Sequence, residues 1–155
     1  LGPLVNHAPQ QAQLIAVFNL QMERIYNYLL QKNENIFTII HSLDGYDEIS
    51  LTNDTRVITA DGEKIMTPEQ LGKRMVSPQD ISGGNSVEEA AKIFLAILNG
   101  KGSWAQNAVV LANAAMALFG TGAFKSYSDA YDISVESLDS GKAKEVFDKL
   151  ISLQK

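Results

Sequence analysis

Cysteine is absent from this chain of 155 residues. Its absence excludes disulfides, thiolate zinc sites and cysteine nucleophiles together, and it suits a reducing compartment. We therefore expect a cytoplasmic protein. A glycine-rich phosphate loop, an HExxH zinc motif and a serine-nucleophile elbow are also missing, so none of these routes to catalysis has support in the sequence.

Positive charge is scarce, since 13 Lys and Arg stand against 18 Asp and Glu for a net charge of -5. Nucleic-acid binding needs basic surface to neutralise phosphates, so we expect no nucleic-acid partner. The most apolar stretch, 108–119, is interrupted by Asn113 and is shorter than the roughly 20 residues that span a bilayer, so we expect no membrane segment. The start of the chain, Leu1 to Asn6, has neither Met nor a signal-peptide pattern, and we expect it to have been cut from something longer.

Hydrophobic residues make up 45% of the chain, enough for one packed core of ordinary domain size. The apolar run Leu14–Phe18 predicts a strand, and the helical spacing of apolar residues from Met22 to Leu30 predicts an amphipathic helix. The β-branched run Ile36–Ile40 predicts a strand that is buried on both faces. Together they predict a βαβ unit with two parallel strands side by side. Ligands of such units gather beyond the carboxyl ends of the strands, which directs attention to His41–Thr52.

The middle of the chain has the alternation of short strands, at Glu48–Leu51, Arg56–Thr59 and Lys64–Met66. These runs predict a small β-rich insert. Two helix-start signals follow, each a capping residue before a proline, at Thr67-Pro68 and Ser77-Pro78.

From Ser86 onward the pattern is helical throughout, with capping signals at Ser86 and Ser103 and two later helices around Tyr127–Leu138 and Val146–Ile151. We expect these helices to pack over the sheet. The predicted fold class is therefore α/β: a partial central sheet with a parallel βαβ unit, a small β-rich insert and a C-terminal set of packed helices.

The adjacent carboxylates Asp47 and Glu48 directly follow the buried strand and a turn at Gly45, close to a third acid, Asp44. Mg²⁺ bound to a phosphorylated substrate takes one or two carboxylates and keeps several waters, so this cluster fits a magnesium site. A solvated acidic loop explains the same residues, and the pattern alone favours it.

Three further features have simpler explanations than chemistry. His41 could polarise a substrate group, but a hydrogen-bonded structural histidine is the commoner case. The Gly83-Gly84-Asn85 segment before a capped helix could hold an anion, although the glycines by themselves explain a tight turn. Asn113, inside an apolar helix, must satisfy its amide, and we expect its partner in a neighbouring loop. His7, in a turn-forming loop, receives no role.

Several segments resemble anthranilate phosphoribosyltransferase, in the order of that family and over essentially the whole chain. They are Leu1–Asn6, His41–Ser50, Gly83–Asn85 continuing to Glu89–Ala91, Asn113–Ala115 and Leu138–Ala143. The resemblance is to the C-terminal part of the family's α/β domain, which would occupy 1–155 with the N-terminal helical domain absent. It implies transfer of a phosphoribosyl group from phosphoribosyl pyrophosphate to anthranilate in tryptophan biosynthesis, by a complete enzyme that is a homodimer.

The resemblance also implies roles for individual residues. Asp47 and Glu48 match an Asp-Glu pair that binds Mg²⁺ on the pyrophosphate side, and Asn6 and Pro9 lie in the segment that matches a substrate-binding loop. No catalytic nucleophile is implied. The chain departs from the family at His7, where the family commonly has Pro. The family's phosphoribosyl-pyrophosphate loop and anthranilate-binding Arg would lie before Leu1, so we expect the chain alone to be inactive.

Two other functions remain as alternatives. One is a nucleic-acid-binding paralogue of the same fold, which the pI near 5.0 and the intact Asp47-Glu48 pair disfavour. The other is a related nucleoside phosphorylase, which the ordered motifs fit less well.

Overall fold

The computed structural model describes residues 10–32 and 36–154. Its sheet has four strands in the order β1-β2-β3-β4. The strands are β1 (Ala12–Ala16), β2 (Ile36–Ser42), β3 (Thr55–Thr59) and β4 (Gly62–Met66). β1 and β2 are parallel, with Ala12 beside Ile36, and the other neighbouring strands are antiparallel. The parallel βαβ unit and the β-rich insert are therefore confirmed.

The helices follow the capping signals of the sequence. They are α1 (Leu20–Leu30), α2 (Pro68–Gly72), the short 3-10 helix η2 (Pro78–Ile81), α3 (Val87–Leu98), α4 (Trp104–Phe119), α5 (Tyr127–Asp139) and α6 (Lys142–Leu153). Side chains of Ser86, Ser103 and Ser126 cap α3, α4 and α5 by accepting from a backbone N–H three residues on. No helix among the described residues is long and apolar enough to cross a membrane.

The sheet is covered on both faces, because β2 alternates its side chains between two hydrophobic clusters. Phe37 and Ile39 pack with α1 residues such as Tyr26 and Leu30. Ile40 points to the opposite face, where the second cluster includes small residues of α4. The end of α4 approaches β2 closely, since a Cβ added at Gly120 would lie 2.9 Å from Thr38 Oγ1.

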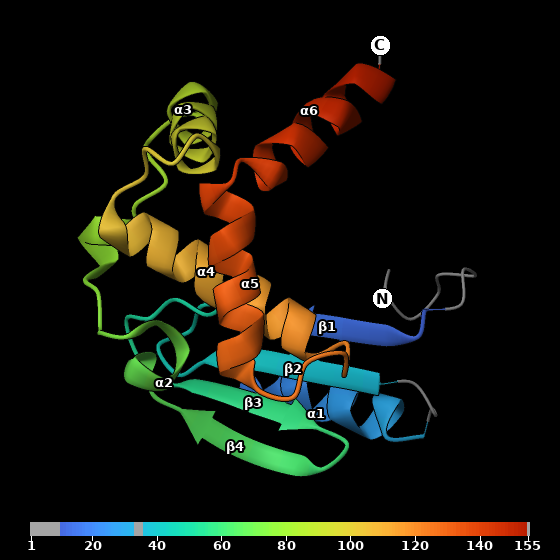
Figure 1. The fold of residues 1–155 in the computed structure, drawn as a ribbon. Helices are drawn as coiled ribbons and strands as arrows, with labels where there is room; N and C mark the ends of the chain where they lie inside the picture. The colour runs from blue at the N-terminus through green and yellow to red at the C-terminus, as the bar shows by residue number, and fades with distance from the viewer. Residues whose placement is uncertain (1–9, 33–35, 155) are drawn as a thin grey trace.

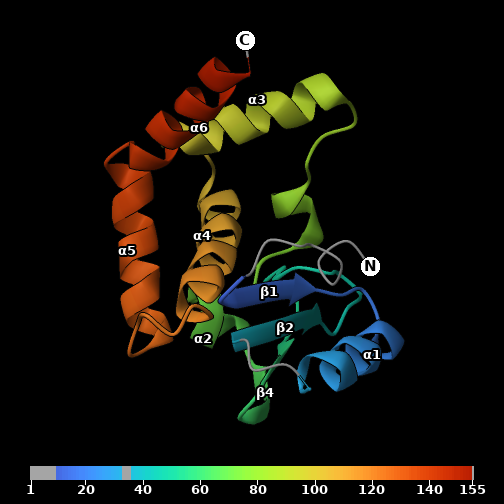
Figure 2. The ribbon, with the colours of Figure 1, turned by 90° about the vertical axis from the view of Figure 1, so that its right-hand side faces the viewer.

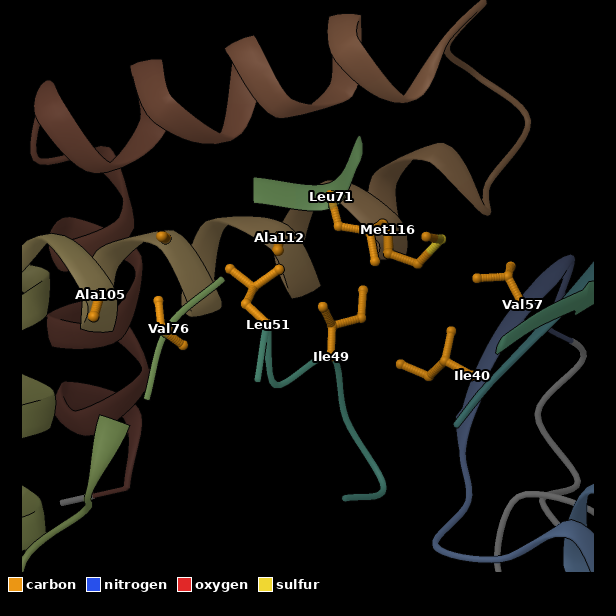
Figure 3. Close-up of a cluster of buried hydrophobic side chains, with 10 residues drawn as sticks. Ile40, Ile49, Leu51, Val57, Leu71, Val76, Ala105, Ala112 and Met116 are labelled. Carbon is orange, nitrogen blue, oxygen red and sulfur yellow. The ribbon is translucent and has the colours of Figure 1, made fainter. Parts of the chain in front are cut away.

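The second cluster, here called the α4 core, joins the sheet, α4, α2 and the segment between β2 and β3. Figure 3 shows nine of its side chains labelled. Its buried members are Ile40, Ile49, Leu51, Val57, Leu71, Val76, Ala105, Ala108, Ala112 and Met116. The alanines of α4 leave room for the larger side chains that come from the loop and the sheet.

The expectation that all helices after Ser86 pack over the sheet is wrong for α3 and α6. In Figure 2 α4 rises from the sheet, α5 lies beside α4, and α3 and α6 lie at the end that is away from the sheet. There they contact each other, with the rings of Phe94 and Phe147 5.0 Å apart. α3 buries only Ile97 and α6 buries no residue, so large apolar side chains of both helices, among them Val87, Val146 and Leu153, stay exposed.

Candidate functional site

The site predicted from the sequence lies on the segment that joins β2 to β3, residues 43–54, here called the acidic loop. Asp47 and Glu48 are exposed on this loop, beyond the carboxyl end of a strand that is buried on both faces. None of the ion pairs among the described residues involves either carboxylate. Their oxygens are therefore open to solvent and to ligands.

Asp44, the third acid, has a different environment. Thr52 Oγ1 donates to Asp44 Oδ2 and Ser50 Oγ lies 3.5 Å from Asp44 Oδ1. The same hydroxyls continue inward, with 2.8 Å from Thr52 Oγ1 to Ser50 Oγ and 3.0 Å from Ser50 Oγ to Ser42 Oγ. Asp44 thus closes a chain of hydroxyls within the loop. No group of three or more His, Cys, Asp or Glu that could hold a metal occurs among residues 10–32 and 36–154.

The half of the loop after Glu48 is buried against α4. Ile49 and Leu51 are fully buried in the α4 core, pointing toward Ala112 and Met116 in Figure 3. Asn113 of α4 reaches the same segment, because its Nδ2 donates to Ile49 O at 2.8 Å and its Oδ1 accepts from Ile49 N at 3.0 Å. The predicted loop partner for the Asn113 amide is confirmed.

The predicted strand Glu48–Leu51 is wrong. The backbone of Ile49 pairs with the Asn113 side chain instead of a strand, and Leu51 has a φ of +58°, outside the extended region. Leu51 O then accepts from Val76 N at 3.0 Å, so the loop is held from two sides. The alternating apolar residues belong to a buried loop, and the hydrogen-bond partners of this loop come from distant parts of the chain.

His41 is a structural residue, as the commoner explanation predicted. Its side chain is buried, and its Nδ1 lies 2.8 Å from Val17 O at the end of β1. A carbonyl oxygen only accepts, so Nδ1 carries the proton and donates. The bond ties the carboxyl ends of the two parallel strands together directly before the acidic loop.

A buried carboxylate that the sequence did not single out lies on the α1 face of the sheet. Glu23 of α1 is 2% exposed, and its Oε1 lies 3.3 Å from Arg56 Nε on β3. Arg56 also pairs with Glu63 at 2.7 Å. Burial raises the pKa of Glu23, and the Arg56 guanidinium opposes that rise without cancelling it. The apolar pattern of α1 gave no signal for this pair, because only the register of β3 brings Arg56 to the helix.

The Gly83-Gly84 segment before α3 is a turn. Gly84 has a φ of +84°, and the Glu89 carboxylate accepts from Asn85 N at 2.6 Å. A side chain of the protein therefore occupies the place where an anion would bind. The remaining candidates of the sequence, Asn6, His7 and Pro9, lie outside the described residues.

Comparison with known proteins assigns the chain to a family. The model of the glycosyl transferase family, a/b domain, matches residues 1–144. This chain belongs to that family. It is 49% identical to the anthranilate phosphoribosyltransferase of Flavobacterium johnsoniae over 153 residues, which cover 99% of this chain and 46% of the relative. It is 44% identical to the enzyme of that name from Bacteroides fragilis strain YCH46, with the same coverage.

Solved structures of the family agree with this assignment. The anthranilate phosphoribosyltransferase of Thermus thermophilus matches with a TM-score of 0.82 and 25% identity, over 97% of this chain and 45% of that one. The fold is shared with the Saccharomyces cerevisiae enzyme in complex with PRPP and Mg, at a TM-score of 0.74 and 18% identity over 87% of this chain and 39% of that one. The resemblance drawn from the motifs is confirmed. This chain spans about half the length of the curated relatives it matches.

Proposed function

We propose that this glycosyl transferase chain forms part of an anthranilate phosphoribosyltransferase. The reaction transfers a phosphoribosyl group from phosphoribosyl pyrophosphate to the amine of anthranilate and releases pyrophosphate. The observation that carries the proposal is the high identity to enzymes of that name along nearly the whole chain. We place the reaction in tryptophan biosynthesis in the cytoplasm and the complete enzyme as a homodimer, as the resemblance implies. Neither alternative function gains an observation in its favour.

We further propose that Asp47 and Glu48 hold Mg²⁺ together with the pyrophosphate of the substrate. The donor set fits, because both are hard oxygen ligands, both are exposed and neither is used in an ion pair of the described residues. Two carboxylates are a poor site for so strongly hydrated an ion, so phosphate oxygens and water must complete it. When bound, the ion supplies neutralisation of the charge that develops on the leaving pyrophosphate.

The protein's own contribution is to place these two carboxylates at the surface of the loop. The acidic loop is fixed at its base by the α4 core and by the hydroxyls of Ser42, Ser50 and Thr52, while Asp47 and Glu48 stay in water. Asp44 is engaged by Thr52 and has a structural role in the loop.

A complete enzyme provides the test. This chain would replace the matching residues of the Flavobacterium johnsoniae relative, and consumption of anthranilate would be followed as Mg²⁺ is varied. Asp47→Asn with Glu48→Gln keeps the shapes and removes two charges. We expect kcat/KM at limiting Mg²⁺ to fall by on the order of 100-fold, with partial recovery at high Mg²⁺.

The matched control is Asp139→Asn with Glu145→Gln, which makes the same chemical change at two exposed carboxylates near the junction of α5 and α6, at the far end of α4 from the sheet (Figure 1). It should leave the magnesium dependence unchanged. Stability of both double variants should stay within about 0.5 kcal/mol for each substitution. Full activity of the Asp47/Glu48 variant at limiting Mg²⁺ would show that the pair is only a solvated acidic loop. A chimaera that is folded and inactive with the wild-type pair would count against the transferase assignment itself.

A further inference from the structure

We propose that Asn113 is a positioning residue for the acidic loop, and that its amide holds the backbone from which Glu48 and Asp47 present their carboxylates. The inference rests on the proposed function for its consequence in metal binding. Its structural basis is independent of that function, because it depends only on contacts between α4 and the loop.

The side-chain amide of Asn113 bonds both the backbone N–H and the backbone C=O of Ile49. Asn113 Oδ1 accepts from Ile49 N at 3.0 Å and Asn113 Nδ2 donates to Ile49 O at 2.8 Å. This is the pairing that a neighbouring strand would provide, supplied here by one planar amide. The residues are 64 positions apart in sequence, so the bond exists only in the folded protein.

Fixing Ile49 N fixes the peptide plane between Glu48 and Ile49. The Cα atom of Glu48 lies in that plane, so the bond restrains the point from which the Glu48 side chain leaves the backbone. Asp47 is one residue further from the anchor. The two carboxylates therefore lie at the boundary where a backbone bound to α4 becomes an exposed turn.

Asn113 is itself held in place. Its Nδ2 also donates to Val109 O at 2.9 Å, one helical turn back, so both protons of the amide are used and the amide plane is defined. Ala112 and Met116, next to it along α4, are packed in the α4 core. The position of the Asn113 amide is therefore set by the packing of α4 in the α4 core and by the bond to Val109 O.

The other contacts of the loop do not replace this bond. Leu43 N donates to Asp54 O and Val76 N donates to Leu51 O, while Ser42 N donates to Tyr46 O and Ser42 Oγ accepts from Ser50 N. None of these bonds reaches the backbone of Ile49. The side chains of Ile49 and Leu51 contribute apolar packing, which has little directional preference. Among the described residues, the Asn113 amide is the group that bonds both backbone atoms of Ile49.

The test compares Asn113→Ala with the control Asn107→Ala, which makes the same change on the same helix at a residue that has no bond to the loop in the described structure. Amide hydrogen exchange by NMR is the first measurement. In Asn113→Ala we expect the Ile49 amide to lose at least 10-fold in protection, while the Leu43 and Val76 amides keep theirs. Retained protection at these two amides shows that the fold is intact. Unchanged protection of Ile49 would overturn the proposal.

The second measurement is binding of Mn²⁺ with pyrophosphate to the chimaera described above, with Mn²⁺ as a paramagnetic substitute for Mg²⁺ that broadens nearby amide signals. Outer groups that orient a ligand typically change metal affinity 10- to 100-fold, so we expect Asn113→Ala to bind on the order of 10-fold more weakly and Asn107→Ala to match wild type. A loss of thermal stability without a loss of affinity would reduce Asn113 to a purely structural role and overturn the proposal.

Asn113→Asp provides a second variant, since it retains an acceptor for Ile49 N and loses the donors to Ile49 O and Val109 O. Protection of the Ile49 amide should fall less than in Asn113→Ala, and equal loss in the two variants would contradict the assigned bonding. The Asp47→Asn/Glu48→Gln chain separates the two proposals. If the chimaera with this change binds Mn²⁺ and pyrophosphate like the unchanged chimaera, or if the unchanged chimaera does not bind them, the metal assignment fails and Ile49 exchange alone decides the role of Asn113.

Discussion

Leu51 offers a quantitative test of how the acidic loop is built. It is a non-glycine residue with a φ of +58°, and its side chain is fully buried in the α4 core. A Cβ added at Gly72 would lie only 2.5 Å from Leu51 Cδ1, so the side chain packs directly on the end of α2. Leu51 therefore makes two opposing contributions to the free energy of unfolding: burial of its side chain stabilises the fold, and its left-handed backbone destabilises it.

The two quantities are separated by paired substitutions. Leu51→Ala removes the buried side chain and should cost about 2–5 kcal/mol. Leu51→Gly removes the same contacts but also relieves a left-handed conformation that costs an L-residue about 1–2 kcal/mol. The greater conformational freedom of glycine in the unfolded chain opposes this gain by about 0.4–1 kcal/mol. We expect Leu51→Gly to be as stable as Leu51→Ala, or more stable by up to about 1 kcal/mol.

Leu71 is the matched control, because it is 1% exposed, belongs to the same core and lies in helix α2. There Gly should be less stable than Ala by about 1 kcal/mol. Urea denaturation of the four variants measures both differences. In thermal unfolding each kcal/mol corresponds to about 2–4 °C for a chain of this size. If Leu51→Gly were less stable than Leu51→Ala by the same margin as at Leu71, the left-handed backbone at Leu51 would be refuted.

Two further predictions concern polar groups, the buried Glu23 and the half-buried Tyr127. Burial raises the pKa of Glu23, so the folded state disfavours the ionised form of this side chain. The stability that the protonated Glu23 contributes is therefore fully present below its unfolded pKa near 4.5 and is lost as pH rises through the folded pKa. Glu23→Gln should therefore be more resistant to urea than wild type at pH 8, with the difference vanishing toward pH 4.5, and a constant difference across this range would contradict the pKa direction. Tyr127 OH donates to Leu71 O at 2.5 Å and lies 3.2 Å from Ala112 O, so Tyr127→Phe should lower the free energy of unfolding by about 1–3 kcal/mol. Tyr131→Phe, the control on the same helix, should lose less than Tyr127→Phe, and equal losses would argue against the bond.

Much of the local structure followed from the sequence because the signals act over a few residues. The capping serines before α3 and α4 and the threonine before α2 placed three helix starts correctly. The β-branched run after Asn35 gave a strand buried on both faces. The first strand is found at Ala12–Ala16 instead of Leu14–Phe18, because Asn19 caps α1 and Phe18 is 62% exposed beside it.

Only part of the candidate site could be predicted from local sequence signals. The position of Asp47 and Glu48 after a buried strand indicated an exposed acidic segment, and the structure places both carboxylates in solvent. Their assignment to Mg²⁺ comes from the family resemblance and stays a prediction. Asp44 was grouped with them by proximity in sequence, yet Thr52 engages it, because the loop folds back on itself.

The sequence by itself determined most helices, the strands after Asn35 and Asp54, the parallel βαβ unit and the family, since propensity, capping and motif order are properties of neighbouring residues. Tertiary structure alone decided that Ile49–Leu51 is a buried loop, that Arg56 of β3 meets Glu23 of α1 and that Asn113 binds the backbone of Ile49. The physical reason is that a backbone or side-chain polar group accepts any partner of correct geometry. Only the packing of α1 and α4 on the sheet selects which distant partner that is.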